Sequence, residues 1–300
     1  MRIILLNITA IVFLIVSGCR TTPTNGKTIT DYNLASPDVS IILPGILHEI
    51  SGLTYIDSTS VACIQDEKGI LFVYDLIKKE IINQYPFHSK GDYEGIARVD
   101  KTIYVLRSDG NIFGISDYES ENSVVTNYHT GIPAKNNEGL CYDKSNNRLL
   151  VACKGISAKG SGHKDKRVIY GFDLISKTLT KKPVFEFDIK AIKEFALNKE
   201  VKLRKKTKKK GRVAEPMIRF ETSDIGIHPL TGKLFLLSST DHLMFIFDMN
   251  GSIEQIEELS PGLFIQPEGI TFFENGDLLI SNEGKNRNAT LLRFNYRQKK

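Results

Sequence analysis

A unit of about 43 residues recurs along the chain, and this repeat constrains the fold more than any other feature of the sequence. Each unit opens with an apolar segment that contains a glycine, and these glycines are Gly52, Gly95, Gly139, Gly226 and Gly269. Successive glycines are 43, 44, 87 and 43 residues apart, so one interval is close to two periods. A repeat of this length is typical of architectures in which similar units stack against one another.

Each unit contains further short apolar runs separated by turn residues. A turn rich in Asp, Asn, Ser or Gly leads to a second run, as at 149–153. A third run ends in an aromatic residue followed by an acid, as at 245–248, and a more polar fourth run follows, as at 80–85. Four short strands per unit are typical of a propeller blade. We therefore predict an all-β fold, a single β-propeller of five four-stranded blades over residues 37–300.

The two ends of the repeat region predict how the propeller closes. The chain stops after the third run of the fifth unit, whereas the apolar run 38–43 precedes the first unit and has no blade of its own. Placing this N-terminal strand on the last blade completes that blade and covers an open strand edge. Six blades are the alternative, because a further blade would fit between Thr178 and Phe220. Residues 186–206, however, have a helical and charged pattern.

The N-terminus predicts export and a lipid anchor. A charged start and an apolar run make residues 1–18 a signal peptide, too short for a membrane span. Residues 16–19, Val-Ser-Gly-Cys, resemble the bacterial lipobox, which implies cleavage before Cys19 and lipidation of its thiol. An ordinary signal peptide is the alternative. Residues 19–36 are polar and predict a flexible tether. We thus expect a lipoprotein of the cell envelope, on the outer or inner membrane, facing the periplasm or the cell surface.

The charge of the chain is concentrated in one segment. The formal net charge is +5, yet eight Lys and Arg and no acid lie between residues 201 and 212, so the remainder is mildly acidic. This is not the distributed basic footprint of a nucleic-acid-binding protein. We predict that the basic insertion at about 190–215 is a solvated excursion. Alternatively its basic part, from Lys202 to Arg212, contacts anionic lipid.

Three cysteines follow Cys19 in the sequence. Cys63 and Cys153 occupy matching places in apolar runs, which favours small buried packing residues. Cys141 and Cys153 flank one predicted hairpin, and export would permit a disulfide between them. The odd number of thiols favours free buried cysteines, and the pairing of Cys141 with Cys153 stays open.

The glycine segments also predict where a functional site lies. The innermost strand of each blade lines the central channel, and its start meets the end of the antiparallel second strand at one mouth. The acids beside the repeat glycines should therefore converge there: Glu94, Glu138, Glu268 and Asp224. The same argument adds further residues to the predicted mouth: Ser51, Asp66, Asp109, Lys154, Asp241 and Glu283.

Converging carboxylates repel one another, so they must take up protons, pair with cations or bind a metal ion. Carboxylate oxygens suit Ca²⁺, and no spacing of His and Cys residues typical of zinc is present. We therefore predict a Ca²⁺ site formed by the three glutamates and Asp224. The alternative for each acid is a structural one, in which the carboxylate accepts backbone N–H groups at a strand end.

Several motifs together resemble the SdiA-regulated, YjiK-like family of β-propeller lipoproteins. They are the segments 49–55 (EISGLTY), 92–96 (DYEGI), 137–140 (NEGL), 267–270 (PEGI) and 281–283 (SNE). The resemblance covers about residues 37–297, apart from the basic insertion. The family includes a calcium-regulated propeller and is loosely related to phytase-like propellers. The resemblance implies a propeller fold and an envelope location, whereas the family's own activity is poorly defined.

Two functions are compatible with the sequence. One is a binding or sensory module that presents Ca²⁺ or a polar ligand at the channel mouth. The other is a metal-assisted hydrolase of phosphate esters or lactones, with Lys154 and Glu283 as candidate catalytic residues. The sequence contains no nucleophile elbow, phosphate-binding loop or dinucleotide motif, and we assign surface or structural roles to His48, His228 and His242. We expect a monomer that does not bind nucleic acid.

Overall fold

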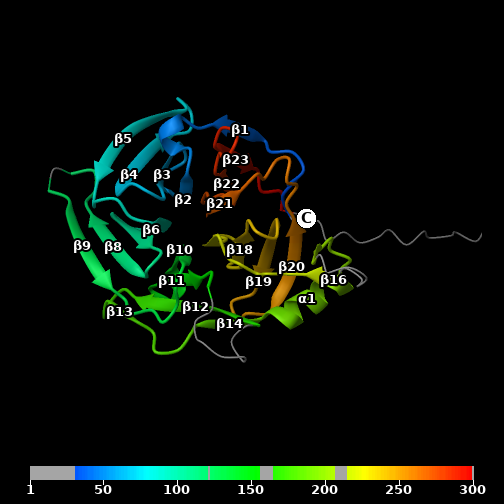
Figure 1. Cartoon of the computed structure of the whole chain (residues 1–300). Coiled ribbons are helices and arrows are strands. Elements are labelled where there is room, and N and C mark those ends of the chain that lie inside the picture. Colours follow the sequence, from blue (N-terminus) through cyan, green and yellow to red (C-terminus); the bar gives the residue numbers. More distant parts are fainter. Residues whose placement is uncertain (1–30, 121, 156–164, 207–214, 299–300) are drawn as a thin grey trace, which may run out of the picture.

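Five β-sheets surround a central axis in the computed structural model, which describes residues 31–120, 122–155, 165–206 and 215–298 (Figure 1). The predicted five-bladed propeller is confirmed, and the six-bladed alternative is wrong, because the described residues between 178 and 220 form no further blade. The predicted signal peptide, Cys19 and most of the tether lie outside the described residues. No helix within the described ranges is long and apolar enough to cross a membrane.

The first three blades follow one another along the chain. Blade 1 contains β2 (Ile50–Tyr55), β3 (Ser60–Gln65), β4 (Ile70–Asp75) and β5 (Glu80–Pro86). Blade 2 contains β6 (Tyr93–Val99), β7 (Thr102–Arg107), β8 (Asn111–Ser116) and β9 (Val124–His129). Blade 3 contains β10 (Asn137–Asp143), β11 (Arg148–Cys153) and β12 (Lys166–Asp173). Two short strands, β13 (Thr178–Leu179) and β14 (Phe185–Asp188), share its outer edge by pairing with β12.

The last two blades follow the insertion. Blade 4 contains β17 (Asp224–Ile227), β18 (Leu234–Ser238), β19 (Leu243–Phe247) and β20 (Ile253–Glu258). Blade 5 contains β21 (Pro267–Phe272), β22 (Leu278–Asn282), β23 (Thr290–Phe294) and the N-terminal strand β1 (Val39–Ile42). Two single-turn 3₁₀ helices, η1 (Gly45–Leu47) and η2 (Lys144–Asn146), lie in connections.

The N-terminal strand closes the ring as predicted. β1 pairs antiparallel with β23, with Val39 opposite Arg293 and Ile42 opposite Thr290. Ile41, which belongs to β1, is buried in a cluster with residues of blades 1 and 5. The first and last parts of the repeat region are therefore joined, and β1 covers the outer edge of β23 as the fourth strand of blade 5.

Apolar packing between neighbouring blades forms the core. Five clusters of buried side chains are present, and each combines residues from two adjacent blades. The inner strands approach so closely that only glycine fits at some positions: a Cβ atom on Gly95 would lie 2.8 Å from Cβ of Leu140. This close approach is the physical reason for the repeated glycine.

The basic insertion is folded over most of its described length. Helix α1 (Ile189–Asn198) begins at Asp188, whose carboxylate accepts hydrogen bonds from the N–H groups of Lys190 and Ala191. Ile192 and Ala196 are buried against blades 3 and 4, and the short strands β15 (Arg204–Lys206) and β16 (Glu215–Met217) pair beyond the helix. The insertion is therefore anchored in the core through Ile192 and Ala196, while most of its described residues are exposed, as expected of a solvated segment. Residues 207–214 lie outside the described part.

The three described cysteines are buried and free, as favoured from the sequence. Cys141 lies opposite Leu150 and Cys153 opposite Asn137, so the two thiols are not cross-strand partners. Burial raises the pKa of Cys63 and Cys153 to about 12. These thiols are therefore packing groups rather than nucleophiles.

Candidate functional site

A β-bulge at the start of the inner strand distinguishes four of the five blades. In blade 2, Tyr93 pairs with Arg107 and Gly95 pairs with Leu106, so Glu94 is the extra, unpaired residue. Glu138 and Glu268 occupy the same position in blades 3 and 5, and Ser51 does so in blade 1. A bulge redirects a side chain and is common next to binding sites. The same local irregularity thus directs all three glutamates.

The glutamates lie within electrostatic reach of one another. Burial, followed by the charges of Glu138 and Asp92, raises the pKa of Glu94 to about 9. Burial and the charge of Glu138 raise the pKa of Glu268 to about 7, while Lys154 opposes this increase. The structure therefore brings together three of the residues expected at the channel mouth.

Lys154 compensates one of the three carboxylates. Its Nζ atom lies 2.7 Å from Oε2 of Glu138, whose side chain is 7% exposed. Burial raises the pKa of Glu138 and the lysine opposes this change. The pKa of Lys154 is raised overall. Burial by itself would lower this pKa, but the negative charges of Glu138, Glu268 and Glu94 outweigh the effect of burial. Lys154 follows β11 directly, as the predicted mouth requires.

Asp224 has a structural role. Its Oδ1 atom accepts hydrogen bonds from the N–H groups of Ile225 (2.8 Å) and Leu140 (3.4 Å), and its Oδ2 atom accepts one from Ile270 (2.8 Å). Burial raises its pKa well above the usual value, and these three donors oppose the change. The carboxylate links the inner strands of blades 3, 4 and 5, which corresponds to the structural alternative considered for each acid.

The register of blade 4 explains this role. A Cβ atom on Gly95 would lie 3.0 Å from N of Leu140, and one on Gly139 would lie 3.0 Å from N of Ile225. Ile225 and Leu140 therefore hold equivalent positions in their blades. Leu140 follows the repeat glycine of blade 3, and Ile225 follows Asp224, so Asp224 takes the place of the repeat glycine in blade 4. The alignment on Gly226 was wrong by two residues, and the residue equivalent to the glutamates is Ser223. Consistently, the Ser51 hydroxyl donates a hydrogen bond to the carbonyl of Tyr93 (2.7 Å), and the Ser223 hydroxyl donates one to the carbonyl of Pro267 (2.9 Å). Each of these carbonyls belongs to the residue directly before the bulge residue of the next blade.

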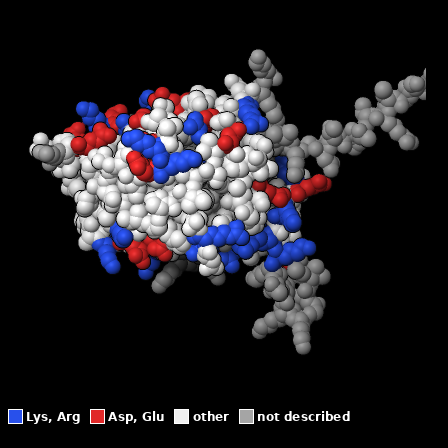
Figure 2. Space-filling view, turned by 90° about the horizontal axis from the view of Figure 1, so that it is seen from above, with Lys and Arg blue, Asp and Glu red and all other residues white. Residues whose placement is uncertain are grey.

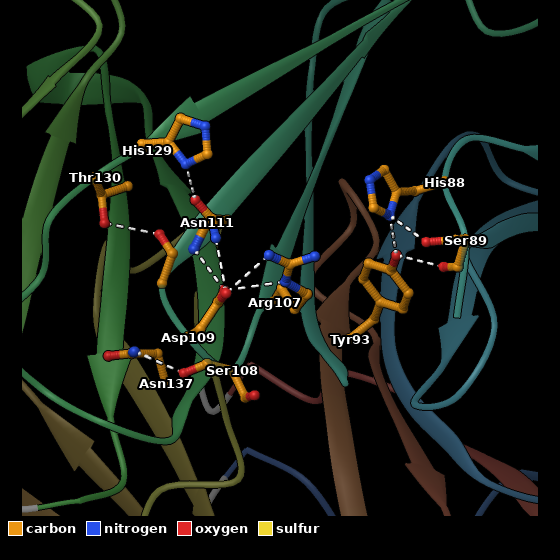
Figure 3. A network of polar contacts seen from close by, with 11 residues as sticks. His88, Ser89, Tyr93, Arg107, Ser108, Asp109, Asn111, His129, Thr130 and Asn137 are labelled. Atoms are coloured by element: carbon orange, nitrogen blue, oxygen red, sulfur yellow. Dashed lines mark hydrogen bonds and ion pairs between the residues drawn. The ribbon is translucent and has the colours of Figure 1, made fainter. Parts of the chain in front are cut away.

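Two other predicted mouth residues are engaged in local contacts. Asp241 is buried and accepts hydrogen bonds from the N–H groups of Arg219 and Phe220 and from the Ser238 hydroxyl. Asp109 accepts hydrogen bonds from the side chains of Arg107 and Asn111 in the β7–β8 turn (Figure 3). Both carboxylates therefore stabilise turns.

Asp66 and Glu283 lie in a second acidic group at the junction of blades 1 and 5. Burial, followed by the charge of Glu49, raises the pKa of Asp66 to about 6. Glu283 accepts a hydrogen bond from the side-chain amide of Gln266, and its pKa is raised by burial. Asp66 and Glu283 influence each other electrostatically, so the structure brings these two predicted residues near one another.

A polar cavity of about 290 Å³ opens beside the glutamates. Its lining includes Lys154, Arg204, Ser223, His242, Gln266 and Glu268. Lys154 and Glu268 were predicted from the sequence as mouth residues, and His242 was expected to border a mouth loop. Ser223 was missed because of the register of blade 4. His242 follows Asp241 directly in a predicted mouth loop, but no sequence signal could have placed Arg204, which comes from the insertion.

The carboxylates do not form a ready metal site. Asp224 has both oxygens engaged by backbone donors, and Glu138 is paired with Lys154. Within the described ranges, no group of three or more His, Cys, Asp or Glu side chains is arranged to hold a metal ion. The raised pKa values of Glu94 and Glu268 favour their neutral forms, and Lys154 pairs with Glu138, so the repulsion between the carboxylates is reduced without a metal ion. Calcium binding stays a prediction.

Comparison with known proteins supports the fold class. No family model matches the chain, and no curated protein matches it. The structure of glutaminyl cyclase from Myxococcus xanthus is similar with a TM-score of 0.55 and 14% identity, over 86% of this chain and 94% of that one. A luciferin-regenerating enzyme matches with a TM-score of 0.45 and 10% identity, over 87% and 95% of the two chains. The five four-stranded blades and the similarity to the glutaminyl cyclase structure identify the chain as a β-propeller protein.

Proposed function

We propose that the channel mouth binds a small polar ligand and that Glu268 exchanges a proton with it. One observation carries this proposal: Glu268 lines the cavity, while burial and the neighbouring Glu138 raise its pKa to about 7. A carboxyl group that titrates near neutral pH is present in both its acidic and its basic form, which suits general acid–base catalysis.

The three glutamates support different roles at neutral pH. The pKa of about 9 keeps Glu94 protonated, Glu138 is held by Lys154, and Glu268 is poised between its two forms. Neighbouring titratable groups whose environments separate their pKa values are typical of acid–base sites. The inner surface of the site therefore offers a hydrogen-bond donor, a fixed ion pair and a group that transfers protons.

The reaction class that fits is proton transfer to or from a bound molecule or a water molecule. Hydrolysis of a lactone, an ester or a phosphate ester belongs to this class, and so does an intramolecular cyclisation. Peptides with N-terminal glutamine belong among the test substrates because one similar structure is a glutaminyl cyclase. A ligand that binds without turnover would instead make this protein a binding or sensory module.

The cellular setting belongs to the same proposal. The lipobox-like residues before Cys19 support a lipoprotein of the cell envelope, and the Glu-Gly motifs support kinship with the SdiA-regulated, YjiK-like family. The described chain begins beside blades 4 and 5, where Tyr32 is buried and donates a hydrogen bond to the carbonyl of Gly276 in the β21–β22 turn. The β21–β22 turn is at the end of blade 5 opposite Glu268, so a tether attached there would leave the mouth accessible.

The test is an activity screen with a matched pair of variants. Phosphate monoesters, lactones, carboxyl esters and N-terminal glutaminyl peptides are assayed with and without Ca²⁺. Glu268→Gln should lower kcat/KM for any active substrate by about 10²- to 10⁴-fold, the usual contribution of a general acid–base group. Glu274→Gln is the control, because Glu274 is exposed in the β21–β22 turn at the other end of the same blade. Turnover that persists in Glu268→Gln would rule out the proposed proton transfer.

A further inference from the structure

The cavity beside Glu268 has a basic wall. Arg204 and Lys285 line it together with Lys154, and Glu221 and Glu268 are the acids that do so. Lys154 is already paired with Glu138, and Oε2 of Glu221 lies 3.9 Å from a guanidinium nitrogen of Arg219. Among the described residues, no acid pairs with Arg204 or Lys285 within ion-pair distance. Lys285 nevertheless lies near Glu283, because its charge lowers the pKa of that carboxyl group. The lining as a whole has three cations against Glu221 and Glu268, so its charge is positive when Glu268 is protonated.

The positive charges of Arg204 and Lys285 converge on His242. After burial, the charges of Arg204 and Lys285 lower the pKa of His242. Burial and the two cations thus favour the neutral imidazole, although a backbone hydrogen bond with Phe264 and the charge of Asp241 oppose this shift. The Nδ1 atom is buried and has no hydrogen-bond partner within the described part of the chain. A buried polar atom without a partner costs free energy unless a ligand or water completes it. His242 lines the cavity together with Arg204 and Lys285, so these three residues mark one place where an anionic ligand group would be stabilised.

The loop that carries His242 is held rigidly. His242 has a φ of 52°, in the left-handed region that a non-glycine residue seldom adopts. Its preceding neighbour Asp241 is fixed by three hydrogen bonds, and the carbonyl of His242 accepts the N–H group of Leu259. The imidazole is thus positioned in advance rather than ordered by a ligand.

The insertion supplies the arginine of this wall. The Arg204 guanidinium donates a hydrogen bond to the carbonyl of Thr240, which joins β15 to the β18–β19 loop of blade 4. Behind it, Ile192 and Ala196 of α1 anchor the insertion in the core between blades 3 and 4. Figure 2, which views the ring from its rim, shows Lys and Arg side chains gathered along part of one edge, whereas acidic and basic side chains are mixed along the opposite edge.

We propose that Arg204 and Lys285 bind an oxyanion of the ligand, a carboxylate or a phosphate group, next to His242 and Glu268. This inference rests on the proposed function for the location of the site, and it narrows the ligand to anionic molecules. A guanidinium group matches the two oxygens of a carboxylate or phosphate with parallel hydrogen bonds, and a lysine adds a point charge. Because Glu268 is poised to be protonated, it donates a hydrogen bond to such an anion instead of repelling it. The insertion is therefore a specificity element of this propeller.

The experiment measures anion binding directly. Inorganic phosphate and acetate are titrated separately into the full chain at pH 6.5 and low ionic strength, with chloride as the reference anion. The readouts are the unfolding midpoint and the NMR signals of the His242 imidazole. Binding should raise the midpoint and shift the His242 signals, and the stronger of the two probes indicates whether phosphate or carboxylate is preferred.

Two charge-removing variants and one matched control test the residues. Arg204→Gln and Lys285→Gln should each weaken binding of the better probe by about tenfold, the effect of losing one charge-assisted hydrogen bond. Lys205→Gln removes the same charge from the neighbouring residue of β15, which does not line the cavity, and should leave binding unchanged. An equal effect of all three variants would show general charge attraction and overturn the proposal.

The outcomes also separate this inference from the proposed function. Absence of any phosphate or acetate effect on the His242 signals would overturn the oxyanion site, even if Glu268→Gln abolished turnover of a neutral substrate. Conversely, anion binding that depends on Arg204 and Lys285 would stand even if no substrate were turned over. In that case only the proton-transfer role of Glu268 would fail.

Discussion

The Nζ atom of Lys154 lies 2.7 Å from Oε2 of Glu138, and among the described residues this is the one ion pair made by the three glutamates of the inner strands. Lys154→Met should therefore leave Glu138 without its partner in a mostly buried position. We expect the free energy of unfolding to fall by about 1–3 kcal/mol, less than for a fully buried pair, because the Lys154 side chain is 32% exposed. Urea unfolding measures this loss. The double variant Lys154→Met/Glu138→Gln should recover part of it, and additive losses would contradict the pairing.

Asp224→Ala should destabilise the propeller strongly. The substitution leaves the N–H groups of Leu140, Ile225 and Ile270 without their acceptor at the junction of three blades. Each unsatisfied buried group costs about 1–3 kcal/mol, so we expect a loss of about 3–5 kcal/mol after partial relaxation. Asp109→Ala is the control, since Asp109 is exposed and serves one turn, and it should cost less than about 1 kcal/mol. Similar losses for both variants in urea unfolding would rule out the bridging role.

The stability of the protein should decrease as the pH rises above about 5. The pKa values of Glu94 and Glu268 are raised to about 9 and about 7, whereas a glutamate of an unfolded chain titrates near ~4.3. Between these values the folded state binds more protons than the unfolded state, so raising the pH favours unfolding.

Glu94→Gln is expected to flatten this pH dependence because glutamine resembles the protonated carboxyl group. At pH 8 the variant should be more stable than the wild type by at least about 1.4 kcal/mol, the equivalent of one pKa unit. Urea unfolding at pH 5, 7 and 9 gives the comparison, and the exposed Glu274→Gln should leave the curve unchanged. Parallel curves for wild type and Glu94→Gln would show that burial does not raise this pKa.

Calcium binding by the glutamates predicts a thermal shift that depends on Lys154. If Glu94, Glu138 and Glu268 bind Ca²⁺, millimolar Ca²⁺ should raise the Tm of metal-free protein, by about 2–4 °C per kcal/mol for a domain of this size. Lys154→Met should increase the shift, because it frees a carboxylate of the site. The triple substitution of the glutamates by glutamine should abolish it. No shift in either the wild type or Lys154→Met would remove calcium from consideration.

Much of the candidate site followed from the sequence because position in the repeat determines position in the ring. The residue before the repeat glycine is at the mouth in every blade that has the bulge, so Glu94, Glu138 and Glu268 were identified without coordinates. Lys154 was found by the same argument from the end of the second strand. In blade 4 an aspartate, Asp224, replaces the repeat glycine, so the glycine pattern predicts the wrong register for this blade.

The five-bladed ring, its closure by the N-terminal strand and the convergence of three glutamates could be predicted from the amino-acid sequence, because the repeat of about 43 residues encodes them. Tertiary structure alone decided which polar groups are satisfied and which face the cavity. Asp224 became a structural bridge because its carboxylate reaches N–H groups of Leu140 and Ile270 on the two neighbouring blades. Arg204 lines the cavity because α1, which precedes it in the insertion, packs its apolar face between blades 3 and 4. Such contacts join residues far apart in the chain, and no local pattern encodes them.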